Sequence, residues 1–230
     1  MKEKIPVVIE LGGKLSFASA KNWPGFSRSG KDAAEALERL AAYAPRYASV
    51  LQGTNLDFPK ALKAEDFKIV FEVNGGTATD FGVPSMAWPD DEQLPDTAEA
   101  QRWLAILDAA WKAFDQAAQA AQGKQLQQGP RGGGRNLDRM SDHVREAEQG
   151  YMVSLGGKLS PRAKADWSLQ REEVRAAFIE AMNGNLPKIG PRGGKRWPAR
   201  YFIRRSVWHL LDHAWELEDR SLDQGLRIEA

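Results

Sequence analysis

Residues 201–217 of this chain read YFIRRSVWHLLDHAWEL, and their pattern sets the architecture of its second half. The apolar residues recur at intervals of three and four, which is the period of an amphipathic helix. Pro198 stands where the first turn of that helix is expected. His209 and His213 are four residues apart, so both imidazoles project from one face of the helix. The stretch therefore predicts a long helix that carries a histidine pair.

Three segments upstream of this helix show the same period. The first starts at the capping box Asp96-Thr-Ala-Glu99, the second runs from Asn136 to the glycine pair at 156–157, and the third runs from Ser160-Pro161 to Asn183-Gly184. Each segment has one apolar stripe that must be buried against another element. Four such helices in succession predict an all-α up-down four-helix bundle over residues 95–222.

The first part of the chain, residues 1–88, has a different pattern. Residues 5–11 and 15–20 read as two strands joined by a turn at Gly12-Gly13, and residues 67–73 alternate as a third strand. Residues 31–51 have a helical period that Pro45 should bend or divide. Residues 82–96, GVPSMAWPDDEQLPD, contain three prolines and suit a connector. The fold class is thus a small α+β N-terminal module followed by the bundle.

The composition limits the possible functions. With 32 Lys plus Arg against 31 Asp plus Glu, no overall field attracts nucleic acid or an anionic membrane surface. Cysteine is absent, so thiol chemistry would need an external thiol. The apolar run at the N-terminus is too short for a secretory signal, and no window approaches the length of a membrane span. We expect a soluble cytoplasmic protein with a small-molecule substrate and leave homodimerisation open.

The chain has three histidines in all, and the third, His143, lies on the second helix of the predicted bundle. Facing helices of a bundle core can bring such side chains together, so His143, His209 and His213 are the predicted metal ligands. Three neutral imidazoles leave a coordination position open for water or substrate, as in catalytic zinc sites. Nickel or iron would accept the same ligands. The alternative is a packed or exposed histidine pair with an unrelated third histidine.

Other side chains are candidates for supporting roles. Arg205 shares a helix face with His209 and is a candidate catalytic residue, with a surface charge as the alternative. Glu146 follows His143 by one turn and is a candidate to reach the metal or act as a base, with a surface carboxylate as the alternative. Asp212 and Glu216 are candidate acceptors that orient the imidazoles, with surface charges as the alternative.

Two similar loops, at 129–135 and 190–196, each precede a helix that carries histidine. Their arginines are candidates for binding an anionic substrate or cofactor near the mouth of the bundle, although solvated turns would also explain the loops. The residues concerned are Arg131, Arg135, Arg192 and Arg196.

The order of histidines in Met-Ser-Asp-His143-Val-Arg-Glu and Trp-His209-Leu-Leu-Asp-His213-Ala-Trp resembles the DinB-like four-helix bundle family over roughly residues 95–220. That resemblance implies a divalent metal on the triad, most readily zinc, and an enzyme that is a thiol-dependent S-transferase or detoxifies a small molecule. The implied cofactor is a low-molecular-weight thiol such as mycothiol, bacillithiol or glutathione. A non-catalytic binding protein with a structural or vestigial metal site is the alternative.

The N-terminal run Asn-Trp-Pro-Gly25-Phe-Ser-Arg-Ser-Gly-Lys-Asp resembles the hairpin-to-helix stretch of HicB-like modules. This resemblance implies a small α+β fold for the module, and we take no antitoxin role from it.

Overall fold

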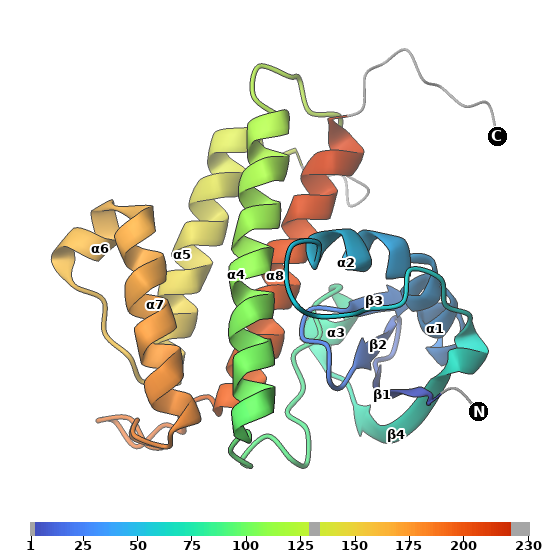
Figure 1. The fold of residues 1–230 in the computed structure, drawn as a ribbon, viewed down its shortest axis with the longest axis horizontal. Coiled ribbons are helices and arrows are strands. Elements are labelled where there is room, and N and C mark those ends of the chain that lie inside the picture. Colours follow the sequence, from blue (N-terminus) through green and yellow to red (C-terminus); the bar gives the residue numbers. More distant parts are fainter. Residues whose placement is uncertain (1–2, 129–133, 222–230) are drawn as a thin grey trace.

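The computed structural model describes residues 3–128 and 134–221 and has an α+β fold (Figure 1). A four-stranded mixed sheet forms the N-terminal part, and the helices of the C-terminal part follow it along the chain. The strands are β1 (Ile5–Leu11), β2 (Ser16–Ala20), β3 (Ser27–Gly30) and β4 (Phe67–Asn74). This agrees with the fold class that the sequence predicts at the level of a module followed by helices.

The sheet has the order β3-β2-β1-β4. β1 pairs with β2 as the predicted antiparallel hairpin, and β4 lies parallel to β1 on its other side. Strand β3 was not expected, because Ser27–Gly30 has no alternation of apolar and polar residues. In β1 the consecutive residues Val7, Val8 and Ile9 are all buried, which requires that both faces of the sheet are covered.

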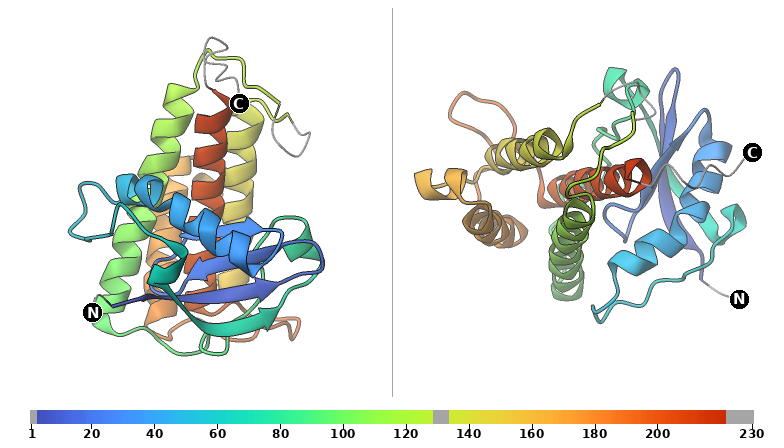
Figure 2. Two further views of the ribbon diagram at one scale, coloured as in Figure 1. Left: turned by 90° about the vertical axis from the view of Figure 1, so that its right-hand side faces the viewer. Right: turned by 90° about the horizontal axis from the view of Figure 1, so that it is seen from above.

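α1 (Ala33–Ala42) covers one face of the sheet, and α8 (Ala199–Arg220) covers the other (Figure 2). α1 is followed along the chain by α2 (Ala44–Val50). Asp32 caps α1 by accepting a hydrogen bond from the Glu35 amide. Pro45 lies in the first turn of α2, so the predicted division of the 31–51 helix is confirmed. Gly25, with φ of +83°, brings the β2–β3 turn against Val207 of α8.

After β4 the chain forms the short helix α3 (Thr77–Asp80) and then the predicted connector, which packs against α8. The Arg204 guanidinium lies 3.6 Å from the centre of the Trp88 ring and forms an ion pair with Asp91. The Tyr201 hydroxyl donates to the carbonyl of Ser85 at 2.9 Å. The connector is therefore fixed to the helical part, and one continuous hydrophobic core runs through both parts of the chain.

The C-terminal part consists of α4 (Thr97–Ala120), α5 (Leu137–Leu155), α6 (Pro161–Ala165), α7 (Trp167–Met182) and α8. Four long helices were predicted close to these bounds, and the third is divided at Asp166, which caps α7. The side chain of Asp166 accepts from the Leu169 amide, while its extended backbone ends α6. No helix in the described ranges is long and apolar enough to cross a membrane.

The helices do not alternate in the up-down order expected from the sequence. Gln149 of α5 donates to Gln170 near the start of α7, and Gly157, just after the end of α5, lies against Ala177 further along α7, so these helices run parallel (Figure 1). In the view of Figure 1, α4 runs upward, α5 and α7 run downward, and α8 runs upward. The physical reason is the segment 156–160, which returns along α7 instead of making a tight turn: Gly157 lies against Ala177, and the Ser160 amide donates to Glu173.

Candidate metal centre

The three histidines meet between α5 and α8. His143 lies near the start of α5, whose first turn is capped by Asn136, and His209 and His213 lie one turn apart on α8. α5 and α8 run antiparallel, since Arg220 at the end of α8 donates to the carbonyl of Arg135 before α5. This arrangement places His143 opposite the histidine pair, as the sequence predicted.

One ring nitrogen from each histidine lies within 4.8 Å of the other two, so the group could hold a metal ion. The Nε2 atoms of His143 and His209 are 3.1 Å apart. Two nitrogens bound to one tetrahedral zinc at about 2.0–2.1 Å would lie about 3.3 Å apart, which is close to that distance. The ring centres are separated by 4.6–5.0 Å, and each pair of rings meets edge to face. The donor set fits a single divalent ion with small side-chain movements.

A carboxylate fixes the orientation of His213. Its Nδ1 atom lies 3.0 Å from Oε2 of Glu216, and Oε1 of Glu216 accepts from Arg220 at 2.9 Å. Since Nδ1 is engaged by the carboxylate, the Nε2 atom is left for a ligand. Burial opposes ionisation of Glu216, but the hydrogen bond from His213 and the Arg220 charge outweigh it and hold its pKa below the usual value. The lowered pKa favours the carboxylate form of Glu216, which can accept the Nδ1–H of His213.

Burial keeps the other two imidazoles neutral. It lowers the pKa of His143 to about 4, with contributions from His213 and Arg135. The pKa of His209 also lies well below its ordinary value, first because of burial and then because of the neighbouring histidines. His209 is only 7% exposed. Neutral imidazole is the form that binds a metal, so no proton has to be removed from these two groups near pH 7.

Arg205 and Tyr151 border the triad. The Tyr151 ring centre lies 5.7 Å from that of His209, and the Arg205 guanidinium lies 5.6 Å from the Tyr151 ring. Arg205 was predicted from its spacing to His209, whereas Tyr151 was assigned only to the apolar stripe of its helix. The charge of Arg205 is one of the causes that lower the pKa of His209. This cation therefore makes the surroundings of the triad more favourable to an anion.

The other predicted site residues are placed differently. Glu146 is exposed on α5, and its neighbour Glu148 is the buried carboxylate of this helix. Asp212 accepts a hydrogen bond from Arg28 of β3, so it links α8 to the sheet. Glu216 is the acceptor that contacts a histidine of the triad. Its partner Arg220 was missed, although its position four residues after Glu216 is a usable signal.

The described parts of the two arginine-containing loops do not form one cradle. Arg131 lies outside the described residues, and Arg135, just before α5, is exposed and accepts through its carbonyl from Arg220 at the end of α8. Arg192 is exposed, and Arg196 donates to the carbonyl of Val153 near the start of α8. A helix of 22 residues is about 33 Å long, so the two described parts of these loops lie far apart.

Comparison of the chain with protein-family models, with curated proteins and with solved structures finds no match. The site is thus defined by its own geometry: three converging imidazoles, a carboxylate that orients one of them, and a neighbouring arginine.

Proposed function

We propose that this chain is a divalent-metal protein with a DinB-like helical part, and that it acts as a metal-dependent enzyme, most readily a thiol-dependent S-transferase or another enzyme that modifies a small electrophile. The observation that carries the proposal is the convergence of His143, His209 and His213 from two helices. Three histidine ligands with no carboxylate among them leave an open position and a net positive site.

The residues of the chain prepare this site for an anionic ligand. Glu216 holds His213 in one orientation, and Arg220 holds Glu216. Arg205 adds a positive charge beside His209. A divalent ion held by the three imidazoles would act as a Lewis acid that lowers the pKa of a bound thiol or water. Because the chain has no cysteine, the thiol would come from a separate molecule.

The first experiment tests metal binding. Protein purified without a histidine tag is reconstituted with zinc, nickel or iron(II), and the bound metal is measured by elemental analysis. We expect close to one ion per chain in the wild type and none in His209→Gln, with Glu172→Gln as the control because Glu172 is an exposed carboxylate on α7. Failure of the wild type to retain any of these metals would defeat the proposal.

The second experiment separates the enzyme from a binding protein with a structural metal site. Thiol conjugation is measured for zinc-loaded and metal-free protein across a panel of electrophiles, together with the thermal unfolding of both forms. Loss of conjugation on removal of the metal supports the enzyme. If the metal raises the unfolding temperature and no thiol conjugates to any electrophile, the structural role holds instead.

A further inference from the structure

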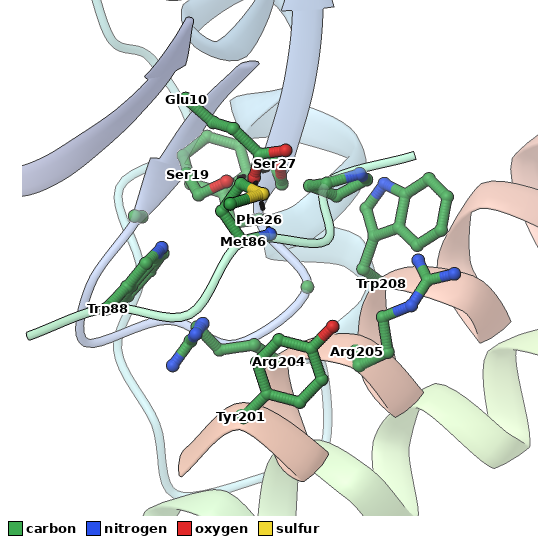
Figure 3. Close-up of a pocket in the computed structure, with 13 residues that line it drawn as sticks. Glu10, Ser19, Phe26, Ser27, Met86, Trp88, Tyr201, Arg204, Arg205 and Trp208 are labelled. Atoms are coloured by element: carbon green, nitrogen blue, oxygen red, sulfur yellow. Dashed lines mark hydrogen bonds between the residues drawn. The ribbon is translucent and has the colours of Figure 1, made fainter. Parts of the chain in front are cut away.

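A small cavity lies between the sheet, the connector and α8 (Figure 3). Its volume of about 30 Å³ is room for about two water molecules, or for one carboxylate group. The wall on the α8 side is made by side chains that follow one another at helical spacing, namely Tyr201, Arg204, Arg205 and Trp208. Arg205 lines this cavity and also contacts Tyr151, whose ring lies against His209 of the triad.

The charged groups of the cavity wall have partners, with one exception. Glu10 is 3% exposed, and its two carboxylate oxygens accept from the Thr79 hydroxyl and from the amides of Ser85 and Met86. Arg204 forms a two-bond ion pair with Asp91. The carboxylate oxygens of Glu10 are thus engaged by neutral donors, and the charge of Arg204 is paired with that of Asp91.

Arg205 is the exception among the described residues of the wall. Its Nη1 atom is fully buried and has no hydrogen-bond partner, and the same holds for Nε1 of Trp208. The guanidinium lies 4.8 Å from the centre of the Trp208 ring, and Figure 3 shows it beside that indole. Folded proteins rarely leave buried donors without an acceptor. Two such donors on neighbouring side chains of one cavity wall are the groups that an acceptor from outside the chain would satisfy.

This pair also lies close to the triad. Arg205 precedes His209 by one helical turn, an axial rise of about 6 Å. The Tyr151 ring contacts both of them, with distances of 5.6 Å to the Arg205 guanidinium and 5.7 Å to the His209 ring centre. A molecule bound at the triad through one end would therefore reach Arg205 with a group two or three bonds away.

We propose that Arg205 and the indole N–H of Trp208 form a subsite for the carboxylate of the small molecule that binds at the histidine triad. The planar guanidinium, held against the indole, presents its N–H groups in the geometry that matches a carboxylate. The small volume of the cavity favours this planar anion over a bulkier phosphate. The inference rests on the proposed function in one respect, that the triad is where the rest of the molecule binds.

The test compares two ligands that differ in charge and little in shape, 3-mercaptopropionate and 3-mercaptopropionamide. Both are titrated into ¹⁵N-labelled zinc-loaded protein, and the indole N–H signal of Trp208, assigned with Trp208→Phe, is followed. We expect the acid to bind at least about tenfold more tightly than the amide and to shift this signal, because an arginine–carboxylate pair is charge-assisted.

In Arg205→Met the two affinities should become equal, while Arg205→Lys should keep part of the preference and Arg162→Met, at an exposed position of α6, all of it. Equal affinities in the wild type, or a preference that survives in Arg205→Met, would overturn the subsite. Propionate titrated into metal-free protein keeps the two proposals apart. If propionate shifts the Trp208 signal but the protein retains no metal, the subsite is supported and the proposed function fails. If the protein binds zinc and thiol without preferring the carboxylate, the proposed function is supported and the subsite fails.

Discussion

His213 and Glu216 form a hydrogen-bonded pair across one turn of α8, with 3.0 Å between Nδ1 and Oε2. Glu216 is in turn held by Arg220, which also donates to the carbonyls of Gln127 and Arg135. The loop between α4 and α5 is thus connected to the orientation of a candidate metal ligand. Arg220 therefore contacts both Glu216, which orients His213, and Arg135, which lies just before α5, the helix that carries His143.

The first prediction concerns this pair. Glu216→Ala removes the acceptor that orients His213, so zinc affinity should fall by about 10- to 100-fold while the fold is retained. Competition with a chromophoric chelator measures the affinity. Glu172→Ala, which removes an exposed carboxylate of α7, serves as the control and should leave the affinity unchanged. An unchanged affinity in Glu216→Ala would show that the carboxylate does not support metal binding.

The second prediction is a pH dependence of stability in the metal-free protein. The pKa of His143 is about 4 in the folded chain and about 6.5 when unfolded, because burial disfavours the charged imidazole. Between these values the unfolded chain binds a proton that the folded chain does not, so the free energy of unfolding falls as the pH falls from about 6.5 to about 4. Below that window both states are protonated and the effect ends.

Urea unfolding of the wild type and of His143→Gln at several pH values from 7.5 to 4 measures this contribution. The variant should lose less stability than the wild type over the window, and the remaining loss includes that of His209, whose pKa is shifted in the same direction. Identical pH profiles for the two proteins would be incompatible with a neutral, half-buried His143.

The third prediction concerns the contact between the sheet and α8. The Arg28 guanidinium lies 3.7 Å from the Tyr43 ring centre and 4.2 Å from that of Trp215, and it pairs with Asp212 at 3.1 Å. Arg28→Ala would leave Asp212 without this cation and remove a stacked contact, at a cost on the order of 3 kcal/mol. Denaturant unfolding checks the loss, with the exposed Arg192→Ala as a control that should change little.

The fourth prediction concerns Glu148, which is buried between α4, α5 and α7. It accepts from Nε1 of Trp111 at 2.6 Å and from Nε2 of Gln170 at 2.9 Å, and burial raises its pKa. Glu148→Ala leaves both donors without this acceptor, so the free energy of unfolding should drop by at least about 2 kcal/mol. A variant as stable as the wild type would mean that water or a rearrangement satisfies these donors.

The sequence predicted the elements that have a clear period. The hairpin, the division at Pro45 and the long helices follow from local patterns, and the capping residues Asp96, Asn136 and Ser160 begin helices as expected. Strand β3 could not be found in this way, because Ser27–Gly30 is stabilised by pairing with β2 and by α1, not by its own pattern. The parallel arrangement of α5 and α7 was also out of reach, since a five-residue loop allows either a turn or a return path.

The candidate metal centre was likewise predictable from the sequence only in part. The convergence of His143 with the α8 pair was predictable from helical spacing and the antiparallel packing of facing helices. The unpaired state of Arg205 and Trp208 was not, because it depends on the connector and sheet that close the cavity. Arg28 and Asp212 form a hydrogen bond although they are 184 positions apart in the sequence. No local sequence pattern gives information over such a separation.

The central position of α8 affects the order in which the chain can acquire its structure during synthesis. α8 covers one face of the sheet and packs against α4, α5 and α7, yet it leaves the ribosome after all of these elements. Until residues 199–220 emerge, the nascent sheet and the nascent helices each expose an apolar surface that only this segment fills. A chain stalled or cleaved before residue 199 should therefore be a substrate for chaperones or proteases, and His143 alone would have no partner for metal binding.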